Sequence, residues 1–330
     1  MTSPEALTPP PSSSDASDRP VAVITGAGQG IGRHTALGLA RAGFHVAVVA
    51  RSAERGRETV ADLAQALDPS PEPALSPAFP PSFSWAAADL ALGDAIRDAA
   101  GTLLVRHPRI HLLVNNAGVA SRDYRVTPEG RERTLAVNHL APVRLTHHLM
   151  PGLVAAGTRG SGESARIVIL SSGAHAKRLD LTAFEGPRGY SGLHAYAQSK
   201  LLNLLHTFDL AEHLRGSGIT VNAVHPGLAP TGLLMDFLPS GIVRRTLSPM
   251  LRMVARSPEQ GARTPLHVAT SPEVAGTTGG YFAKEAPADP AAAALERENQ
   301  EGVRRWTQNL IGLDWRAIPL PEEDPQAQGD

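Results

Sequence analysis

The sequence predicts an α/β fold: one doubly wound parallel sheet of about seven strands, with helices on both faces, in a single domain. Two observations support this prediction. Short apolar runs rich in β-branched residues alternate with segments of helical periodicity along most of the chain. A glycine-rich turn, GAGQGIG, joins the first such run to the first helical segment, at the edge where sheets of this type bind ligands.

The composition excludes several classes of protein. A chain of 330 residues, 42% of them hydrophobic, is long enough for one large domain with tails. A formal net charge of -1 argues against a nucleic-acid binder, which needs a basic surface. Cysteine is absent, which excludes disulfides, thiolate zinc sites and cysteine nucleophiles and is compatible with a reducing cytoplasm.

The two ends of the chain differ in composition from its middle. Residues 1–19 are rich in Pro, Ser and Asp and contain no basic or apolar leader, so we expect a disordered tail rather than a secretory signal. No apolar run is long enough to cross a membrane, and we expect a cytoplasmic protein without an integral membrane segment. The main domain is expected at 20–286, followed by a C-terminal extension at 287–330.

The first half of the chain contains four expected strands. VAVIT is a short buried strand, and the helix after it ends at Gly43, a residue type that suits a helix C-terminus. The prolines of the segment 68–82 forbid a helix or a central strand, so we expect a surface insertion there. In order, we expect a strand at 21–25, a helix at 31–43, a strand at 45–51, a helix at 51–67, a strand at 84–90, a helix at 91–107 and a strand at 110–118.

The second half continues the alternation and adds one unusual segment. We expect a long helix at 128–156, a strand at 165–172, a helix at 194–215, strands at 219–227 and 279–283, and a helical piece at 291–310. The segment 232–257 is apolar with interspersed arginines and is expected to be a substrate lid, with Leu233, Leu234, Met235 and Phe237 near an apolar substrate. A helix resting on a membrane surface is the alternative, which the interrupting prolines weaken.

The turn TGAGQGIG, at Thr25–Gly32, has the properties of a phosphate-binding loop. Glycines Gly26, Gly30 and Gly32 allow the backbone to turn tightly and to approach a pyrophosphate closely. The helix that follows offers unpaired N–H groups to an anion. A glycine-rich turn without a ligand is the alternative, and the absence of a GK[ST] ending excludes a kinase or ATPase loop.

A tyrosine and a lysine stand one helical turn apart in HAYAQSKLLN. Tyr196 and Lys200 would share a helix face, and Lys200 is one of only three lysines in an arginine-rich chain. A free tyrosine has a pKa of about 10, and a nearby ammonium lowers it. The pair is therefore a candidate proton donor and acceptor, although a surface pair would have the same spacing.

Taken together, these motifs resemble those of the short-chain dehydrogenase/reductase family. Its glycine loop, its NNAG signature and its YxxxK pair occur in the family's order, and the match extends over about Pro20–Ala283. VNHLAPVRLTHHLMPGL and AYAQSKLLNLL are most similar to the retinol-dehydrogenase-like, NADP-dependent subgroup. Further matching positions are Asp89 and Leu90 after the third strand, Asn138 in a helix, Ser172 after the fifth strand, and Pro226, Gly227 and Thr231 after the sixth.

The resemblance implies a Rossmann fold and a set of residue roles. Tyr196 would be the general acid and base, Lys200 would lower the Tyr196 pKa and hold the nicotinamide ribose, Ser172 would hydrogen-bond the substrate oxygen, and Asn138 would hold a water. Predicted cofactor contacts are Gly26, Gln29, Gly30, Ile31, Gly32, Arg51, Asp89, Leu90, Asn116, Ala117, Gly118, Tyr196, Lys200, Pro226, Gly227 and Thr231.

The end of the second strand predicts which dinucleotide is used. An acidic residue there grips the NAD ribose, whereas arginine suits the 2′-phosphate of NADP. The strand ends in Ala50 and Arg51, so we expect NADP(H) rather than NAD(H), with Arg33 and Arg55 adding charge nearby.

Some candidate residues are ambiguous in the sequence. Ser171 and Ser172 point to opposite faces of a strand, so only one can face a ligand. Tyr190 has no lysine four residues later and is a weaker candidate for the acid. The pair His147–His148 has no partners for a metal, and we predict no metal site; His225 is given no chemistry.

The expected function is hydride transfer between NADP and a carbonyl or secondary alcohol of a fairly apolar small molecule. A catalytically idle dinucleotide-binding scaffold is the alternative, and a NADPH-oxidation assay would separate the two. An epimerase or dehydratase of the extended branch would have TGxxGxxG at the first loop, which this chain lacks. A homo-oligomer remains possible from the sequence.

Overall fold

The computed structural model describes residues 19–67, 82–157, 164–227 and 257–317. The segments between them contain three of the features expected above: the insertion up to residue 81, the lid up to residue 256, and the cofactor contact at Thr231. Nearly all of the N-terminal tail also lies outside the described residues.

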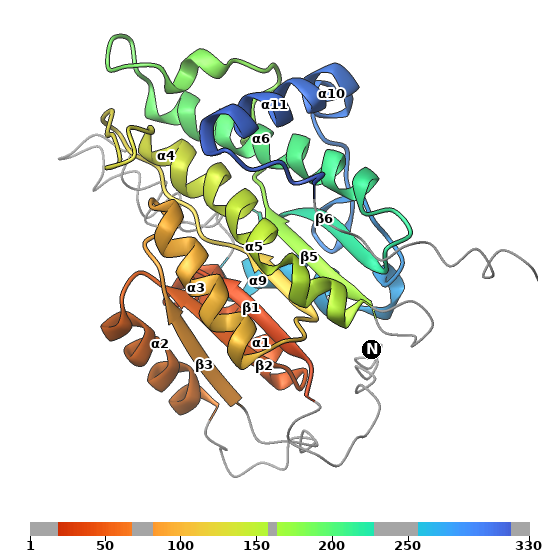
Figure 1. Ribbon diagram of the computed structural model, residues 1–330. Helices are drawn as coiled ribbons and strands as arrows, with labels where there is room; N and C mark the ends of the chain where they lie inside the picture. The colour runs from red at the N-terminus through yellow and green to blue at the C-terminus, as the bar shows by residue number, and fades with distance from the viewer. Residues whose placement is uncertain (1–18, 68–81, 158–163, 228–256, 318–330) are drawn as a thin grey trace, which may run out of the picture.

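One sheet of eight strands forms the centre of the domain, in the order β3-β2-β1-β4-β5-β6-β7-β8 (Figure 1). The first seven strands are parallel and β8 is antiparallel to β7. The strands are β1 (Val21–Thr25), β2 (His45–Ala50), β3 (Ser82–Ala87), β4 (Leu112–Asn115), β5 (Ala165–Leu170), β6 (Ile219–His225), β7 (Tyr281–Ala283) and β8 (Ala286–Pro287).

The expected parallel, doubly wound sheet is confirmed, with a small correction to the strand count. The two-residue strand β8 was missed because Ala286–Pro287 is too short to show any periodicity. It follows a turn in which Lys284 and Glu285 both have positive φ. The order places β1 and β4 side by side, and the crevice of such a sheet opens where the strand order reverses.

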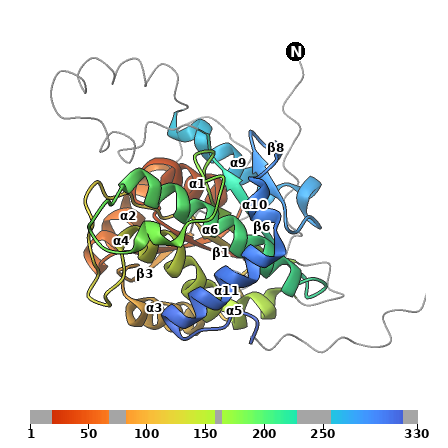
Figure 2. The same cartoon turned by 90° about the horizontal axis from the view of Figure 1, so that it is seen from above.

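Helices cover both faces of the sheet (Figures 1 and 2). One face packs against α1 (Gly30–Arg41), α2 (Ala53–Ala66) and α9 (Pro258–Thr270). The other packs against α3 (Gly93–Arg106), α5 (Ala141–Ala156) and α6 (Gly192–His213). The strands between them are buried on both sides, as their continuous apolar runs predict.

The helix before α5 begins later than the sequence predicts. It starts with the three-residue α4 (Arg133–Leu135) and the π-helical turn η2 (Ala136–Leu140), rather than near residue 128. Residues 126 and 132 instead pair as a short antiparallel bridge around Gly130, whose φ is +73°. The carboxylate of Glu132 accepts hydrogen bonds from the N–H groups of Thr134 and Leu135 and so caps the helix.

Residues 288–317 pack onto the domain. The helices α10 (Ala292–Leu295) and α11 (Arg297–Ile311) lie against α6, and α11 runs beside α6 in both ribbon views (Figures 1 and 2). Trp315 is 1% exposed and donates from Nε1 to the Asp209 carboxylate of α6 at 2.8 Å. This segment therefore supports α6, the helix that carries the Tyr–Lys pair.

Within the described ranges, no helix has both the length and the apolar character that crossing a bilayer requires.

Candidate active site

The glycine loop leads into the start of α1, whose first backbone N–H groups have no side-chain cap. Gly26 has a φ of +72°, and a Cβ on Gly32 would lie 2.2 Å from the Gly26 carbonyl oxygen, so both positions require glycine. Gln29 stands at the N-cap without a side-chain cap, and the first turn of α1 has no acidic residue. Uncapped N–H groups, the positive end of the helix dipole and a tight glycine turn fit the pyrophosphate of a dinucleotide.

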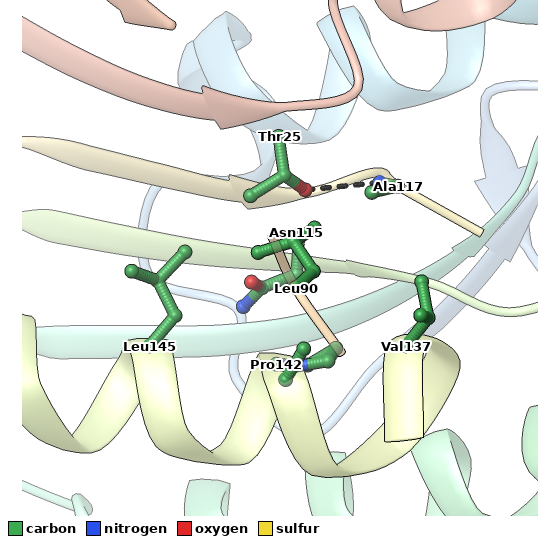
Figure 3. A pocket seen from close by; sticks show the side chains of 8 residues that line it. Thr25, Leu90, Asn115, Ala117, Val137, Pro142 and Leu145 are labelled. Atoms are coloured by element: carbon green, nitrogen blue, oxygen red, sulfur yellow. Dashed lines mark hydrogen bonds between the residues drawn. The ribbon is translucent and has the colours of Figure 1, made fainter. Parts of the chain in front are cut away.

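The loop after β4 is fixed against the end of β1. Thr25 Oγ1 accepts a hydrogen bond from the backbone N–H of Asn116 at 3.0 Å. It accepts another from the N–H of Ala117 at 2.9 Å (Figure 3). The Asn116 side chain donates to the Thr25 carbonyl oxygen at 2.8 Å. Beneath this junction, between the strand ends and α5, lies a small apolar gap bordered by Leu145, with no room for a water molecule. The NNAG motif is thus packed onto the glycine loop.

A cleft of about 1800 Å³ runs along the carboxyl edge of the sheet. It is lined by all of the predicted catalytic and cofactor-binding residues in the described ranges except Asn138. The residues in common are Gly26, Gln29, Gly30, Ile31, Gly32, Arg51, Asp89, Leu90, Asn116, Ala117, Gly118, Ser172, Tyr196, Lys200, Pro226 and Gly227.

Ser172 and Tyr196 both line this cleft, and the Ser172 hydroxyl is close enough to lower the pKa of the Tyr196 phenol. The hydrogen bonds of the two adjacent serines show which hydroxyl is available to a ligand. Ser171 is buried and its hydroxyl donates to the Lys200 carbonyl oxygen of α6 at 2.9 Å. Ser172 Oγ accepts from the Ala174 N–H at 3.1 Å. Of the two serines, only Ser172 therefore offers its hydroxyl to a ligand beside the Tyr196 phenol.

Lys200 is 3% exposed and lies close to both the tyrosine and the loop after β4. Its Nζ is 5.7 Å from the Tyr196 ring centroid and donates to the Leu170 carbonyl oxygen at 2.9 Å. A Cβ on Gly118 would lie 3.5 Å from this Nζ and 3.6 Å from Asn138 Oδ1. The ammonium thus stands between the catalytic candidates and the predicted cofactor contacts.

The pKa directions in this arrangement differ from the sequence-based expectation. Burial raises the pKa of Tyr196, and the nearby Ser172 hydroxyl offsets this only in part. Burial also lowers the pKa of Lys200 to about 8. The expected lowering of the Tyr196 pKa by Lys200 is absent here because desolvation outweighs the ammonium, which is directed at the Leu170 carbonyl.

Asn138 is fully buried in the π-helical turn η2. Its Nδ2 donates to the Val119 carbonyl oxygen at 2.8 Å and to Ser199 Oγ at 3.0 Å, and its Oδ1 accepts from the Val119 N–H at 2.7 Å. The side chain therefore joins the loop after β4 to α6. π-Turns of this kind are frequent at functional sites.

The Tyr190 hydroxyl is engaged by a buried carboxylate. Its hydroxyl donates to Glu132 Oε1 at 3.0 Å, and its ring meets Tyr124 edge to face. Burial raises the pKa of Tyr190 above its ordinary value. These contacts tie the segment between β5 and α6 to the loop between β4 and α4, most of which lines the cleft from residue 119 to residue 128.

The arginines near the glycine loop are not equivalent. Arg33 forms a two-point ion pair with Asp62, at 2.6 and 3.2 Å, and Arg55 pairs with Glu58 at 2.9 Å. These two arginines, which we expected to add charge near the cofactor, are therefore each paired with a carboxylate. Arg51 is exposed in the cleft and has no hydrogen bond or ion pair with the described residues.

Sequence reasoning missed the residues that join one loop to another. Thr25 and Ser199 were given no role, and His225 was set aside. Thr25 holds the loop after β4, Ser199 accepts a hydrogen bond from Asn138, and His225 accepts one from Gly173. The available signal was a polar side chain at the end of a strand, as in Thr25 and His225. The sequence alone does not show what such a side chain contacts.

Residues 20–239 match the family model described as short chain dehydrogenase. The chain belongs to this family. Dehydrogenase/reductase SDR family member 13 from Homo sapiens is 36% identical over 316 residues, which cover 93% of this chain and 77% of that protein. Polyprenol dehydrogenase from Mus musculus is 36% identical over 294 residues, covering 88% and 82%. Retinol dehydrogenase 13 from Homo sapiens is 33% identical over 309 residues, covering 91% and 87%.

Solved structures share the fold over most of the chain. An uncharacterised protein from Mycobacterium Paratuberculosis superposes with a TM-score of 0.68 at 25% identity, covering 92% of this chain and 98% of that one. The 3-ketoacyl-(acyl-carrier-protein) reductase from Brucella melitensis, complexed with NADH, superposes with a TM-score of 0.59 at 25% identity, covering 80% and 96%. The chain is a short-chain dehydrogenase/reductase close to the retinol dehydrogenase subgroup, and it uses a nicotinamide dinucleotide.

Proposed function

We propose that this enzyme transfers a hydride between NADP and a carbonyl or secondary alcohol of an apolar small molecule, with Tyr196 as the general acid and base. The observation that carries the proposal is the placement of the Ser172 and Tyr196 side chains beside the buried Lys200, in the cleft that the glycine loop also lines. A bound nicotinamide dinucleotide would supply the hydride in reduction and accept it in oxidation.

The side chains of this site have distinct tasks in the proposed reduction. The Tyr196 hydroxyl donates its proton to the substrate oxygen as the carbonyl carbon receives the hydride. The Ser172 hydroxyl donates a hydrogen bond to the same oxygen, where negative charge develops. In oxidation, the Tyr196 oxygen takes the proton back, and a cationic Lys200 nearby stabilises the phenolate.

The protonation state that Lys200 prefers depends on the charges around it. Its lowered pKa in this arrangement reflects burial without an anionic partner. A phenolate at Tyr196 would supply the missing opposite charge and favour the ammonium. Asn138, held between Val119 and Ser199, fixes the spacing between the loop after β4 and α6 that brings these groups together.

The preference for NADP is supported by Arg51. It follows β2 directly, where no acidic residue is available to bind a ribose 2′-hydroxyl, and its guanidinium has no partner among the described residues. Since one solved relative holds NADH, similarity of fold alone does not decide between the two dinucleotides.

An apolar substrate is supported by the cleft and by the relatives. Val126 and Leu193, each 53% exposed, line the cleft together with Val137. Two relatives are named for retinol and polyprenol, which are apolar alcohols. We therefore propose long-chain apolar alcohols and their carbonyl forms as the first compounds to test.

The experiment is a turnover assay of wild-type, Tyr196→Phe and Tyr190→Phe enzyme with NADPH and a panel of apolar aldehydes and ketones. Loss of the proton donor should lower kcat about 10²- to 10⁴-fold in Tyr196→Phe and leave the dissociation constant for NADPH within about threefold. Tyr190→Phe, which removes a hydroxyl bonded to Glu132, serves as the matched control and should retain turnover. Equal kcat in Tyr196→Phe and wild type would contradict the proposal, as would a wild type inactive on the whole panel.

A further inference from the structure

His225, the last residue of β6, lies between the two loops that follow β5 and β6. Its Nδ1 accepts a hydrogen bond from the backbone N–H of Gly173 at 2.9 Å and a longer one from that of Gly227 at 3.3 Å. Gly173 directly follows Ser172, and Gly227 belongs to the Pro226–Gly227 turn that lines the cleft. One ring nitrogen therefore joins two neighbouring loops of the active site.

These two hydrogen bonds fix the state of the imidazole. A ring nitrogen accepts only when it carries no proton, so the ring is neutral with its hydrogen on Nε2. The ring also packs closely on Gly173, because a Cβ at that position would lie 2.7 Å from Nε2 and 3.1 Å from Cε1. The loop after β5 is thus held both by a hydrogen bond and by contact with the ring.

Several hydrogen bonds hold the turn at residues 172–175 in place. The Ser172 carbonyl oxygen accepts from the N–H of His175 at 3.1 Å and from its Nδ1 at 2.6 Å. The Nε2 of His175 in turn accepts from the Ala291 N–H at 3.0 Å, in the C-terminal segment. The bond from Gly173 to His225 joins this turn to the last residue of β6, next to the strand hydrogen bond from the Ser171 N–H to the Val224 carbonyl oxygen. It fixes the peptide group between Ser172 and Gly173, and so the position of the serine whose hydroxyl lies near Tyr196.

We propose that His225 is a positioning residue for the reaction, which aligns the Ser172 hydroxyl and the Pro226–Gly227 turn through its Nδ1. The proposal rests on the function proposed above for Ser172 and Tyr196. His225 itself exchanges no proton with the substrate. Its effect should be large, because misplacing a reacting group by about 1 Å can reduce turnover about 100-fold.

Two substitutions separate the acceptor at Nδ1 from the rest of the side chain. The substitution His225→Asn would place a side-chain oxygen at the δ position of the original nitrogen, whereas His225→Gln moves the oxygen one atom further out.

We expect kcat of His225→Asn within about threefold of wild type and kcat of His225→Gln lowered about 10- to 100-fold. The dissociation constant for NADPH, measured by fluorescence, should change less than kcat in both variants. Equal kcat values in the two variants, whether both high or both low, would overturn the proposal, because the position of the acceptor would then be irrelevant.

A second variant tests the same contact from the other side and does not depend on replacing His225. Gly173→Ala would push a methyl group into the imidazole ring, so kcat should fall about tenfold or more with NADPH binding retained. In the His225→Asn background the outer ring atoms are absent, and the added methyl group should cost less than threefold. Wild-type kcat in Gly173→Ala alone would also overturn the proposal.

The tautomer of the His225 imidazole can be determined by NMR, independently of any activity assay. In ¹⁵N-histidine NMR spectra, one histidine that disappears in His225→Asn should have the Nε2–H form with an accepting Nδ1. A His225 resonance in the other tautomer, or in exchange between the two, would contradict the geometry.

The outcomes of the two proposals can be told apart. If Tyr196→Phe retains full turnover, the proposed function fails. If Tyr196→Phe is inactive but His225→Gln keeps wild-type turnover, only the inference about His225 fails.

Discussion

The two halves of the cleft are built in different ways. Around β1 and α1 the site consists of backbone groups brought close together, and glycine is required because no side chain fits between Gly26 and Gly32. Around β5, β6 and α6 it consists of buried polar side chains, each held by one or more hydrogen bonds, as for Ser171, Asn138 and Lys200. Substitutions that add atoms should therefore impair the half around β1 and α1. Substitutions that remove or move a polar atom should impair the half around β5, β6 and α6.

Gly32→Ala should have the largest effect and tests the first half. Its methyl group would lie 2.2 Å from the Gly26 carbonyl oxygen, so the loop must open and the helix N-terminus must shift. We expect the dissociation constant for NADPH to rise at least about 100-fold, and the variant to unfold at a lower temperature. Gly101→Ala, on α3 with nothing within 4 Å, is the control and should bind NADPH normally. Normal binding by Gly32→Ala would refute the description of the loop.

Trp315→Ala tests whether the second half depends on the C-terminal segment. The indole is 1% exposed and hydrogen-bonded to Asp209, a buried carboxylate that also pairs with Arg316. Its removal should cost about 3–5 kcal/mol of the free energy of unfolding in urea. Val105→Ala, at a position 86% exposed, is the control and should change little. A small loss in Trp315→Ala would mean that residues after 287 contribute little to the stability of α6.

The sequence predicted the first half of the site more completely than the second. The spacing of Gly26 and Gly32 is visible in the chain because the loop is local. The environment of Lys200 is not, because it depends on the carbonyl of Leu170, 30 residues earlier. For the same reason the sequence did not show that Arg33 is paired with Asp62, 29 residues away on another helix.

In the fold, too, local features could be predicted from the sequence, and features that depend on contacts with other segments could not. Parallel strands and their covering helices were predicted because each is a continuous local pattern. The start of the helix before α5 was placed too early because a bridge between Val126 and Glu132 competes with helical propensity at 128–132. The strand β8 depends entirely on its pairing with β7.

Lys200→Met tests the electrostatics of the second half. The folded-state pKa of about 8 lies below the ordinary value of 10.5, so folding releases a proton between these pH values. The cost of burying the ammonium is fully present below pH 8 and disappears as the pH rises toward 10.5. The difference corresponds to about 3 kcal/mol. The stability of wild type relative to Lys200→Met, measured by urea unfolding without cofactor, should therefore rise between pH 8 and 10.5. A constant difference would show that the ammonium carries no burial penalty.

Arg51→Glu should have the smallest effect and acts on the cofactor alone. It replaces the cation proposed to bind the 2′-phosphate by a carboxylate suited to a ribose hydroxyl. The ratio of kcat/KM for NADPH to that for NADH should fall about 10- to 100-fold. Arg55→Ala, whose guanidinium is already paired with Glu58, should change the ratio less than threefold. An unchanged ratio in Arg51→Glu would leave the cofactor preference without its proposed cause.

The most direct measurement is a single turnover with NADPH that carries deuterium at the transferred position, mixed with excess enzyme and a carbonyl compound that wild type reduces. We predict that wild type and Tyr190→Phe give an alcohol with one deuterium on the carbinol carbon, and that Tyr196→Phe, with NADPH bound, gives almost none in the same time. Deuterated alcohol formed by Tyr196→Phe at the wild-type rate would contradict a proton-donating role for this tyrosine.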